Sequence, residues 1–174
     1  MRKLDLFIVI LLAAGLLSCG GDNASPDTPR LVKERVAAPS LHGNLLGDPE
    51  EQTVIVILPP TYHTAEQRYP VVYFLHGFTR TAYDAIDFFN YLDSAMQSGV
   101  VREFILVGVN GHNALQGSFY VNSAVTGNWE DHVVKEVIPH IDAHYRTIPE
   151  RRSRGLMGHS MGGFASVNLS LRHP

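Results

Sequence analysis

Runs of apolar residues alternate with helix-length amphipathic segments over most of the chain. Residues 53–58, 71–75 and 104–109 are rich in valine, isoleucine and leucine, and each run is bounded by proline or by Asn-Gly. This pattern predicts three β-strands. The second and third runs are apolar throughout, without the alternation of a half-exposed strand. They are therefore expected to be buried on both faces of a sheet.

Two segments between or after these strands have the periodicity of helices. The first, residues 82–96, places five residues on one face: Ala85, Ile86, Phe89, Leu92 and Met96. The second is predicted to begin at an N-cap formed by Asn128, and Pro139 is expected to kink it. Its buried stripe comprises Val133, Val134, Val137, Ile138, Ile141 and Tyr145. Strands that alternate with helices predict the α/β class, with a mainly parallel sheet and flanking helices.

The first forty residues have a different character. Arg2 and Lys3 precede an apolar run from Leu6 to Leu17, which is too short to span a bilayer comfortably and predicts a signal peptide over residues 1–18. The only cysteine, Cys19, follows directly and resembles the lipidated cysteine of bacterial lipoproteins; a plain secretory signal is the alternative.

The domain boundaries and the localisation follow from this interpretation. Residues 19–40 are predicted to be a lipidated cysteine and a flexible tether, and residues 41–174 the folded domain. The chain is accordingly expected to be exported. A lipid anchor would hold it to a bacterial cell membrane, on the periplasmic or cell-surface side.

Composition narrows the classes of partner and cofactor. The chain has 174 residues, a formal net charge of -3 and 45% hydrophobic residues, which indicates one globular domain with a substantial core. No basic stripe suggests a nucleic-acid partner. A single cysteine excludes an intrachain disulfide and a cysteine-based metal site. His140 and His144 have a spacing that can suit a metal, but no third ligand is evident, so no metal or cofactor is expected.

The sequence Gly158-His159-Ser160-Met161-Gly162 carries the main chemical signal. It matches the G-x-S-x-G nucleophile elbow, in which a strained strand-to-helix turn presents the serine and glycines avoid collisions. A credible helix over residues 164–171 follows, and its N-terminus would stabilise negative charge at the serine. Ser160 is therefore predicted to be a nucleophile; a glycine-rich turn with an idle serine is the alternative.

Acyl transfer also needs two hydrogen-bond donors directed at the developing oxyanion. The N–H of Met161, directly after the serine, is the first candidate. The second is the N–H of Phe78 in the sequence His76-Gly77-Phe78, which follows the strand over residues 71–75. His76 is interpreted as a packed residue that shapes this loop, not as a proton shuttle.

Further motifs are spread from about residue 41 to the end of the chain. They are residues 44–48 (NLLGD), 57–62 (ILPPTY), 68–77 (RYPVVYFLHG), 129–130 (WE), 136–142 (EVIPHID), 158–163 (GHSMGG) and 171–174 (LRHP). Together they resemble the putative esterase family of α/β hydrolases, which includes S-formylglutathione hydrolases, feruloyl, acetyl xylan and enterochelin esterases, and mycolyltransferases. The resemblance implies an α/β-hydrolase fold and a serine carboxylic-ester hydrolase that forms an acyl-enzyme on Ser160. The substrate would be a small-molecule or carbohydrate ester, and an acyltransferase is an alternative.

One requirement of this chemistry is not met by the sequence. In α/β hydrolases the triad acid and histidine follow the serine in the chain. Residues 161–174 contain no Asp or Glu, and their only histidine, His173, is expected on the nucleophile helix and away from the serine hydroxyl.

The absence of a triad acid and histidine after Ser160 predicts that the folded domain is only part of an esterase domain. The resemblance implies about a hundred further residues that carry them. Residues 41–174 are therefore expected to be the N-terminal part of an esterase domain, truncated after the nucleophile helix, inactive alone and with an open strand edge. A degenerate, non-catalytic domain used for binding at the membrane surface is the alternative.

Overall fold

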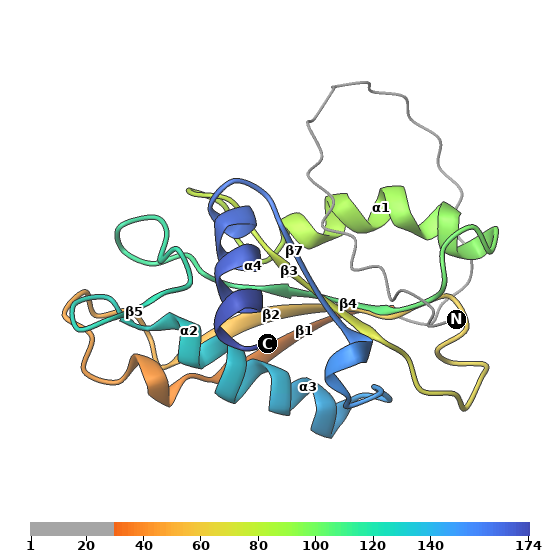
Figure 1. The fold of residues 1–174 in the computed structure, drawn as a ribbon, viewed down its shortest axis with the longest axis horizontal. Helices are drawn as coiled ribbons and strands as arrows, with labels where there is room; N and C mark the ends of the chain where they lie inside the picture. The colour runs from red at the N-terminus through yellow and green to blue at the C-terminus, as the bar shows by residue number, and fades with distance from the viewer. Residues whose placement is uncertain (1–29) are drawn as a thin grey trace, which may run out of the picture.

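A five-stranded mixed sheet forms the centre of the structure, a computed structural model that describes residues 30–174 (Figure 1). Its strands are β1 (Leu31–Ala37), β2 (Glu51–Ile57), β3 (Val71–Leu75), β4 (Ile105–Val109) and β7 (Arg154–Gly158). They lie in the order β1-β2-β4-β3-β7. β3 is parallel to both β4 and β7, whereas β2 is antiparallel to both β1 and β4. β7, which belongs to the parallel half of the sheet, therefore leads directly into the turn that carries the candidate nucleophile, Ser160.

Helices cover both faces of this sheet (Figure 1). They are α1 (Asp84–Gln97), α2 (Trp129–Asp131), the π-helix η2 (His132–Val137), α3 (Ile138–His144) and α4 (Met161–Arg172). Short 3-10 helices, η1 (Pro39–Leu41) and η3 (Arg151–Ser153), and a small ribbon of β5 (Asn122–Ser123) with β6 (Gly127–Asn128) complete the described chain. α1 packs on one face, and η2, α3 and α4 pack on the other.

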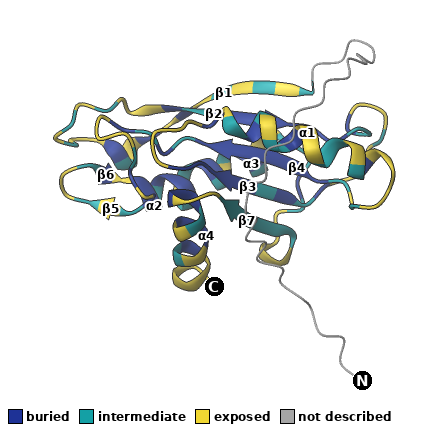
Figure 2. Cartoon of the chain, turned by 90° about the horizontal axis from the view of Figure 1, so that it is seen from above, coloured by how far each residue is buried: buried dark blue, intermediate teal, exposed yellow. Residues whose placement is uncertain are grey.

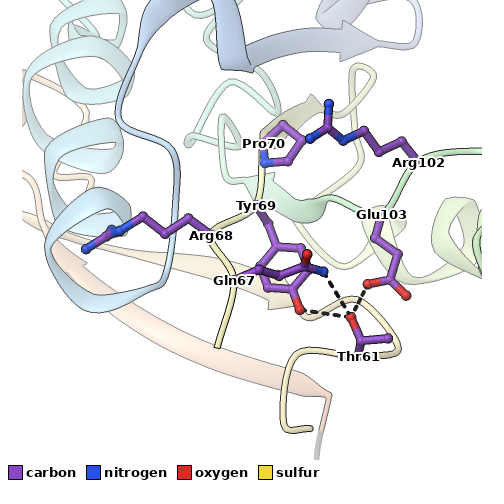
Figure 3. A pocket seen from close by; sticks show the side chains of 7 residues that line it. All are labelled: Thr61, Gln67, Arg68, Tyr69, Pro70, Arg102 and Glu103. Atoms are coloured by element: carbon purple, nitrogen blue, oxygen red, sulfur yellow. Dashed lines mark hydrogen bonds between the residues drawn. The ribbon is translucent and has the colours of Figure 1, made fainter. Parts of the chain in front are cut away.

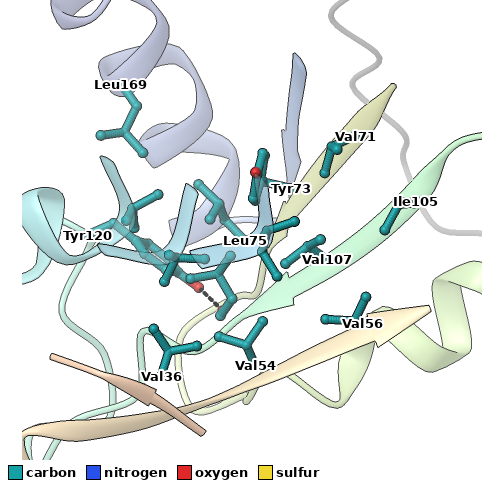
Figure 4. Close-up of a cluster of buried hydrophobic side chains, with 14 of the residues drawn as sticks. Val36, Val54, Val56, Val71, Tyr73, Leu75, Ile105, Val107, Tyr120 and Leu169 are labelled. Atoms are coloured by element: carbon teal, nitrogen blue, oxygen red, sulfur yellow. Dashed lines mark hydrogen bonds between the residues drawn. The ribbon is translucent and has the colours of Figure 1, made fainter. Parts of the chain in front are cut away.

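The period-2 geometry of the strands divides their buried side chains between the two faces. On the face covered by η2, α3 and α4, one cluster joins β2, β3 and β4 to these helices (Figure 4); it includes Val54, Val56, Tyr73, Leu75, Val107, Ile141 and Leu169. On the α1 face the intervening residues form a second cluster, which includes Ile55, Phe74, Ala85, Phe89 and Leu106. The prediction that residues 71–75 and 104–109 form strands buried on both faces is confirmed by β3 and β4, and Figure 2 shows the buried sheet between its helices.

The second predicted helix forms, but two of its details differ. Asn128 occupies the N-cap position of α2, as predicted, but its side chain makes no capping hydrogen bond. Asn128 also pairs with Asn122 in the β5–β6 ribbon. The irregularity expected at Pro139 takes the form of η2, a π-helical stretch that ends just before α3. Pro139 lies at the start of α3, directly after this π-helical stretch.

The predicted tether over residues 19–40 is wrong for its second half. Residues 31–37 form β1, which pairs with β2 over its whole length, and η1 follows it. The ordered domain thus begins before residue 41. Sequence reasoning missed β1 because it is a polar edge strand: Lys33 and Arg35 are exposed, and only Val36 is fully buried.

The N-terminal predictions lie outside the described residues. These are the signal peptide over residues 1–18 and the lipidation of Cys19. Across residues 30–174, none of the helices has the length and apolar character needed to cross a bilayer.

The edge of the sheet at β7 agrees with the expectation of an open strand. Within residues 30–174, β7 pairs only with β3, and its five residues are half-buried. The adjacent helix α4 also exposes apolar side chains at Phe164, Val167 and Leu171. This side of the molecule is therefore unusually apolar for a solvent-facing surface.

Candidate active site

Ser160 occupies the sharp turn between β7 and α4, at the carboxyl end of the parallel strands (Figure 1). Its backbone has φ 52° and ψ −113°, a conformation that L-residues rarely adopt, so the predicted strain is present. The residue is exposed, and its side chain does not cap α4. The hydroxyl is thus presented at the side of the sheet where α/β proteins bind ligands.

The two elbow glycines permit a close crossing of backbone segments. A methyl group at Gly162 would lie 1.8 Å from the carbonyl oxygen of Leu75 at the end of β3. One at Gly158 would lie 2.3 Å from the carbonyl of Gly162. By contrast, a methyl group at Gly163 would meet its nearest atom, the oxygen of Gly158, at an ordinary 3.4 Å. The predicted steric reason for glycine therefore holds at positions 158 and 162.

The loop after β3 lies directly against this turn. A methyl group at Gly77 would come within 3.6 Å of the Ser160 Cβ and 3.0 Å of the His159 Nδ1. Phe78 follows Gly77 in this loop, and α4 begins at Met161, directly after the serine. Within residues 30–174, no backbone hydrogen bond uses the N–H of Phe78 or of Met161. Their part in binding an oxyanion stays a prediction.

His76 holds this loop in place through both ring nitrogens. Its Nε2 accepts from the Gly111 N–H at 2.8 Å, so the Nδ1 carries the proton and donates to the Gly77 carbonyl, also at 2.8 Å. Its backbone N–H donates to the Tyr120 hydroxyl, which donates to the Val109 carbonyl. Burial lowers the pKa of His76, which favours this neutral form. The interpretation of His76 as a residue that shapes the loop is confirmed.

His173 lies at the far end of the nucleophile helix, as expected. Because α4 has twelve residues, its C-terminus lies about 18 Å from Ser160. His173 and Arg172 both hydrogen-bond to the buried carboxylate of Glu130 at 2.8 Å, which ties the end of α4 to α2. Among residues 30–174, no histidine forms a hydrogen bond with Ser160.

The remaining histidine clusters have structural contacts. His132 is fully buried; its Nδ1 lies 2.6 Å from Glu136, which also accepts the Ser40 N–H, so the pair joins η2 to η1. The rings of His140 and His144 stack with centroids 4.1 Å apart. Over the described part of the chain, no three His, Cys, Asp or Glu side chains are grouped so that they could hold a metal ion.

A pocket of about 330 Å³ lies at the opposite end of the sheet from Ser160 (Figure 3). It is lined by Thr61, Gln67, Arg68, Tyr69, Pro70, Arg102 and Glu103, which precede β3 and β4. The Thr61 hydroxyl lies 2.9 Å from the Tyr69 hydroxyl and donates to Glu103. This pocket is therefore separate from the nucleophile, although Thr61 and residues 68–70 belong to the family motifs of the sequence.

Comparisons with known proteins agree with this arrangement. The family model described as "Putative esterase" matches residues 49–174. Esterase Rv1288 of Mycobacterium tuberculosis is 34% identical over 122 residues, which cover 69% of this chain and 26% of that protein. An endo-1,4-beta-xylanase/feruloyl esterase of Xylanibacter ruminicola is 29% identical over 133 residues, or 71% of this chain and 18% of that protein. The chain thus spans only a minor part of these relatives.

Solved structures show the same fold. A ferulic acid esterase superposes with a TM-score of 0.71 and 27% identity, covering 82% of this chain and 55% of that one. An S-formylglutathione hydrolase from Agrobacterium tumefaciens superposes with a TM-score of 0.66 at 20% identity, covering 86% of this chain and 57% of the other. The predicted α/β-hydrolase fold is confirmed, and the chain belongs to the putative esterase family.

Proposed function

We propose that this chain provides the nucleophile and the oxyanion site of a serine carboxylic-ester hydrolase. The observation that carries the proposal is Ser160 itself, exposed at φ 52° on a glycine-flanked turn between β7 and α4. The loop from His76 to Phe78 lies against this turn, as acyl transfer requires. A small-molecule or carbohydrate ester is the proposed substrate.

The chemistry follows from these positions. The Ser160 Oγ attacks the ester carbonyl carbon while its proton passes to a base, and the carbonyl oxygen becomes an oxyanion. The N–H groups of Met161 and Phe78 donate hydrogen bonds to that oxyanion, and the N-terminus of α4 adds its partial positive charge. The alcohol leaves with a proton, and water then hydrolyses the acyl-enzyme. Transfer of the acyl group to a sugar hydroxyl would make the protein an acyltransferase instead.

The general base of this mechanism is not found beside Ser160 among residues 30–174. No histidine or carboxylate among them forms a hydrogen bond with Ser160. Loss of a triad member costs up to about six orders of magnitude in rate, or about 8 kcal/mol of transition-state stabilisation. Residues 30–174 alone should therefore react slowly.

A fluorophosphonate probe tests the proposal directly. We expect slow covalent labelling of the chain, detected by intact mass after prolonged incubation, because the strained turn still presents the hydroxyl. The Ser160→Ala variant should not label, whereas Ser170→Ala, which removes an exposed serine on the same helix, should label like the parent. Labelling that persists in Ser160→Ala would contradict the assignment. No labelling of the parent chain would favour a non-catalytic binding domain.

We also propose that lipidation of Cys19 anchors the exported protein to a bacterial membrane. Since β1 begins at Leu31, residues 20–30 remain as the tether. Cys19→Ser should move the protein from the membrane fraction to the soluble fraction in a bacterial host. Equal membrane retention of the variant would contradict this proposal.

A further inference from the structure

Three phenylalanine side chains form an exposed aromatic surface, which we call the phenylalanine shelf. It comprises Phe78, Phe119 and Phe164, whose exposed fractions are 47%, 45% and 54%. The centroid of the Phe119 ring lies 6.3 Å from that of Phe78 and 6.1 Å from that of Phe164. These distances are within the range of aromatic contacts, so the three rings form one continuous apolar surface.

The shelf borders the candidate nucleophile. Phe78 belongs to the loop that lies against Ser160, and Phe164 lies one helical turn after Ser160, with its N–H donating to the Ser160 carbonyl at 3.0 Å. Phe119 comes from the loop that follows β4 and bridges the other two rings. The shelf therefore lies beside the turn that presents Ser160, next to the place where an ester would bind.

The backbone that carries Phe119 is held in a strained conformation. Phe119 and Tyr120 have φ values of 55° and 53°, which non-glycine residues adopt at an energetic cost. The Phe119 N–H lies 3.4 Å from the Met161 sulfur, and the Tyr120 hydroxyl is fixed by two hydrogen bonds. At Gly117, a methyl group would lie 2.6 Å from the Met161 sulfur, so this loop packs tightly beside the serine. The backbone that carries Phe119 is thus held in place, while its ring remains exposed between the other two rings.

We propose that the phenylalanine shelf binds a flat apolar group of the ester, either its acyl or its alcohol portion. This inference rests on the proposed role of Ser160. None of the three side chains can donate or accept a conventional hydrogen bond, so the shelf offers no polar partner to hydroxyl groups or to an anionic group. Exposed ring faces and edges instead offer offset or edge-to-face contacts to a planar substituent. Rings that already pack against one another also lose less side-chain entropy on binding than isolated ones.

Binding of ester-like amides to the Ser160→Ala chain tests this proposal, because amides resist hydrolysis and the variant lacks the nucleophile. N-methyl-3-phenylpropanamide carries the flat group on the acyl side, N-benzylacetamide carries it on the opposite side, and N-methylacetamide lacks it. We expect one of the first two to bind in an NMR titration and the third to bind at least tenfold more weakly. Phe119→Ala and Phe164→Ala should each weaken the stronger complex about fivefold.

Matched variants distinguish binding by the phenylalanine shelf from general effects of a substitution on the fold. Phe119→Leu keeps an apolar side chain and should retain more affinity than Phe119→Ala, and Val167→Ala, at an exposed apolar site of α4, should change nothing. The stronger amide identifies the acyl or the alcohol side. Equal affinity in the Phe119→Ala/Phe164→Ala double variant, or no preference for the aryl amides, would overturn the proposal. Probe labelling of Ser160 is independent of this titration, so failure of one leaves the other informative.

Discussion

Replacing Gly162 with alanine should destabilise the fold by about 3 kcal/mol or more, the largest effect we expect from any single methyl group in this protein. The added carbon would lie 1.8 Å from the Leu75 carbonyl oxygen and 2.8 Å from that of His76. Both are backbone atoms at the end of β3, so no side chain can rotate away to relieve the contact. α4 would have to shift, and Ser160 with it. Denaturant-induced unfolding followed by circular dichroism measures the loss.

The neighbouring residue supplies the control. Gly163→Ala adds the same methyl group to the same helical turn, but its nearest contact is an ordinary 3.4 Å. Alanine also has a higher helix propensity than glycine by up to about 1 kcal/mol. Gly163→Ala should therefore be neutral or slightly stabilising. Similar losses of stability in the two variants would show that backbone crowding at β3 is not the reason for glycine at position 162.

The second large effect is expected at His76. Substitution by alanine should cost about 3 kcal/mol, because the buried Gly111 N–H loses its acceptor and the Gly77 carbonyl loses its donor, at about 1 to 3 kcal/mol for each unsatisfied group. The removed ring also leaves a cavity in a fully buried site. The loop that carries Phe78 should loosen, since His76 is its link to the turn after β4. The free energy of unfolding and the amide exchange rate of Gly111 both report this change.

A surface histidine gives the comparison for this experiment. His63 is exposed, its ring contacts Tyr62 edge-on, and within residues 30–174 its side chain forms no hydrogen bond. His63→Ala should alter stability by no more than about 0.5 kcal/mol. If His76→Ala were as stable as His63→Ala, with unchanged exchange at Gly111, the loop would not depend on the ring.

Where the signal is local, sequence and structure agree closely. Residues 71–75 were predicted as a strand and form β3 with the same bounds. The predicted helix over residues 82–96 is α1, shifted by one or two residues, and Ala85, Phe89 and Met96 are buried on its inner face. The elbow is equally local, because the glycine spacing and the backbone strain lie within five consecutive residues. Each of these features depends on the period of a strand or helix, or on the steric size of glycine.

The sequence pattern was insufficient to predict the features that depend on pairing between distant segments of the chain. β1 exists because residues 31–37 find the edge of β2, and its alternating polar residues resemble a linker until that edge is known. Asn128 occupies the predicted N-cap position, but its side chain makes no capping hydrogen bond, and the residue pairs with Asn122 in the β5–β6 ribbon. The intrinsic conformational preference of a residue contributes little free energy, so pairing in the tertiary structure can override it.

By itself, the sequence determined the buried strands, the α/β class and the position of Ser160 on a strained turn. Only the tertiary structure decided what surrounds that serine. It sets Phe119 between Phe78 and Phe164, and it places His173 against Glu130, far from the hydroxyl that a catalytic base must reach. The physical reason is that helical and strand periodicity fixes each element alone. Contacts between residues separated by some forty positions arise only when packing of the sheet and its helices brings those elements together.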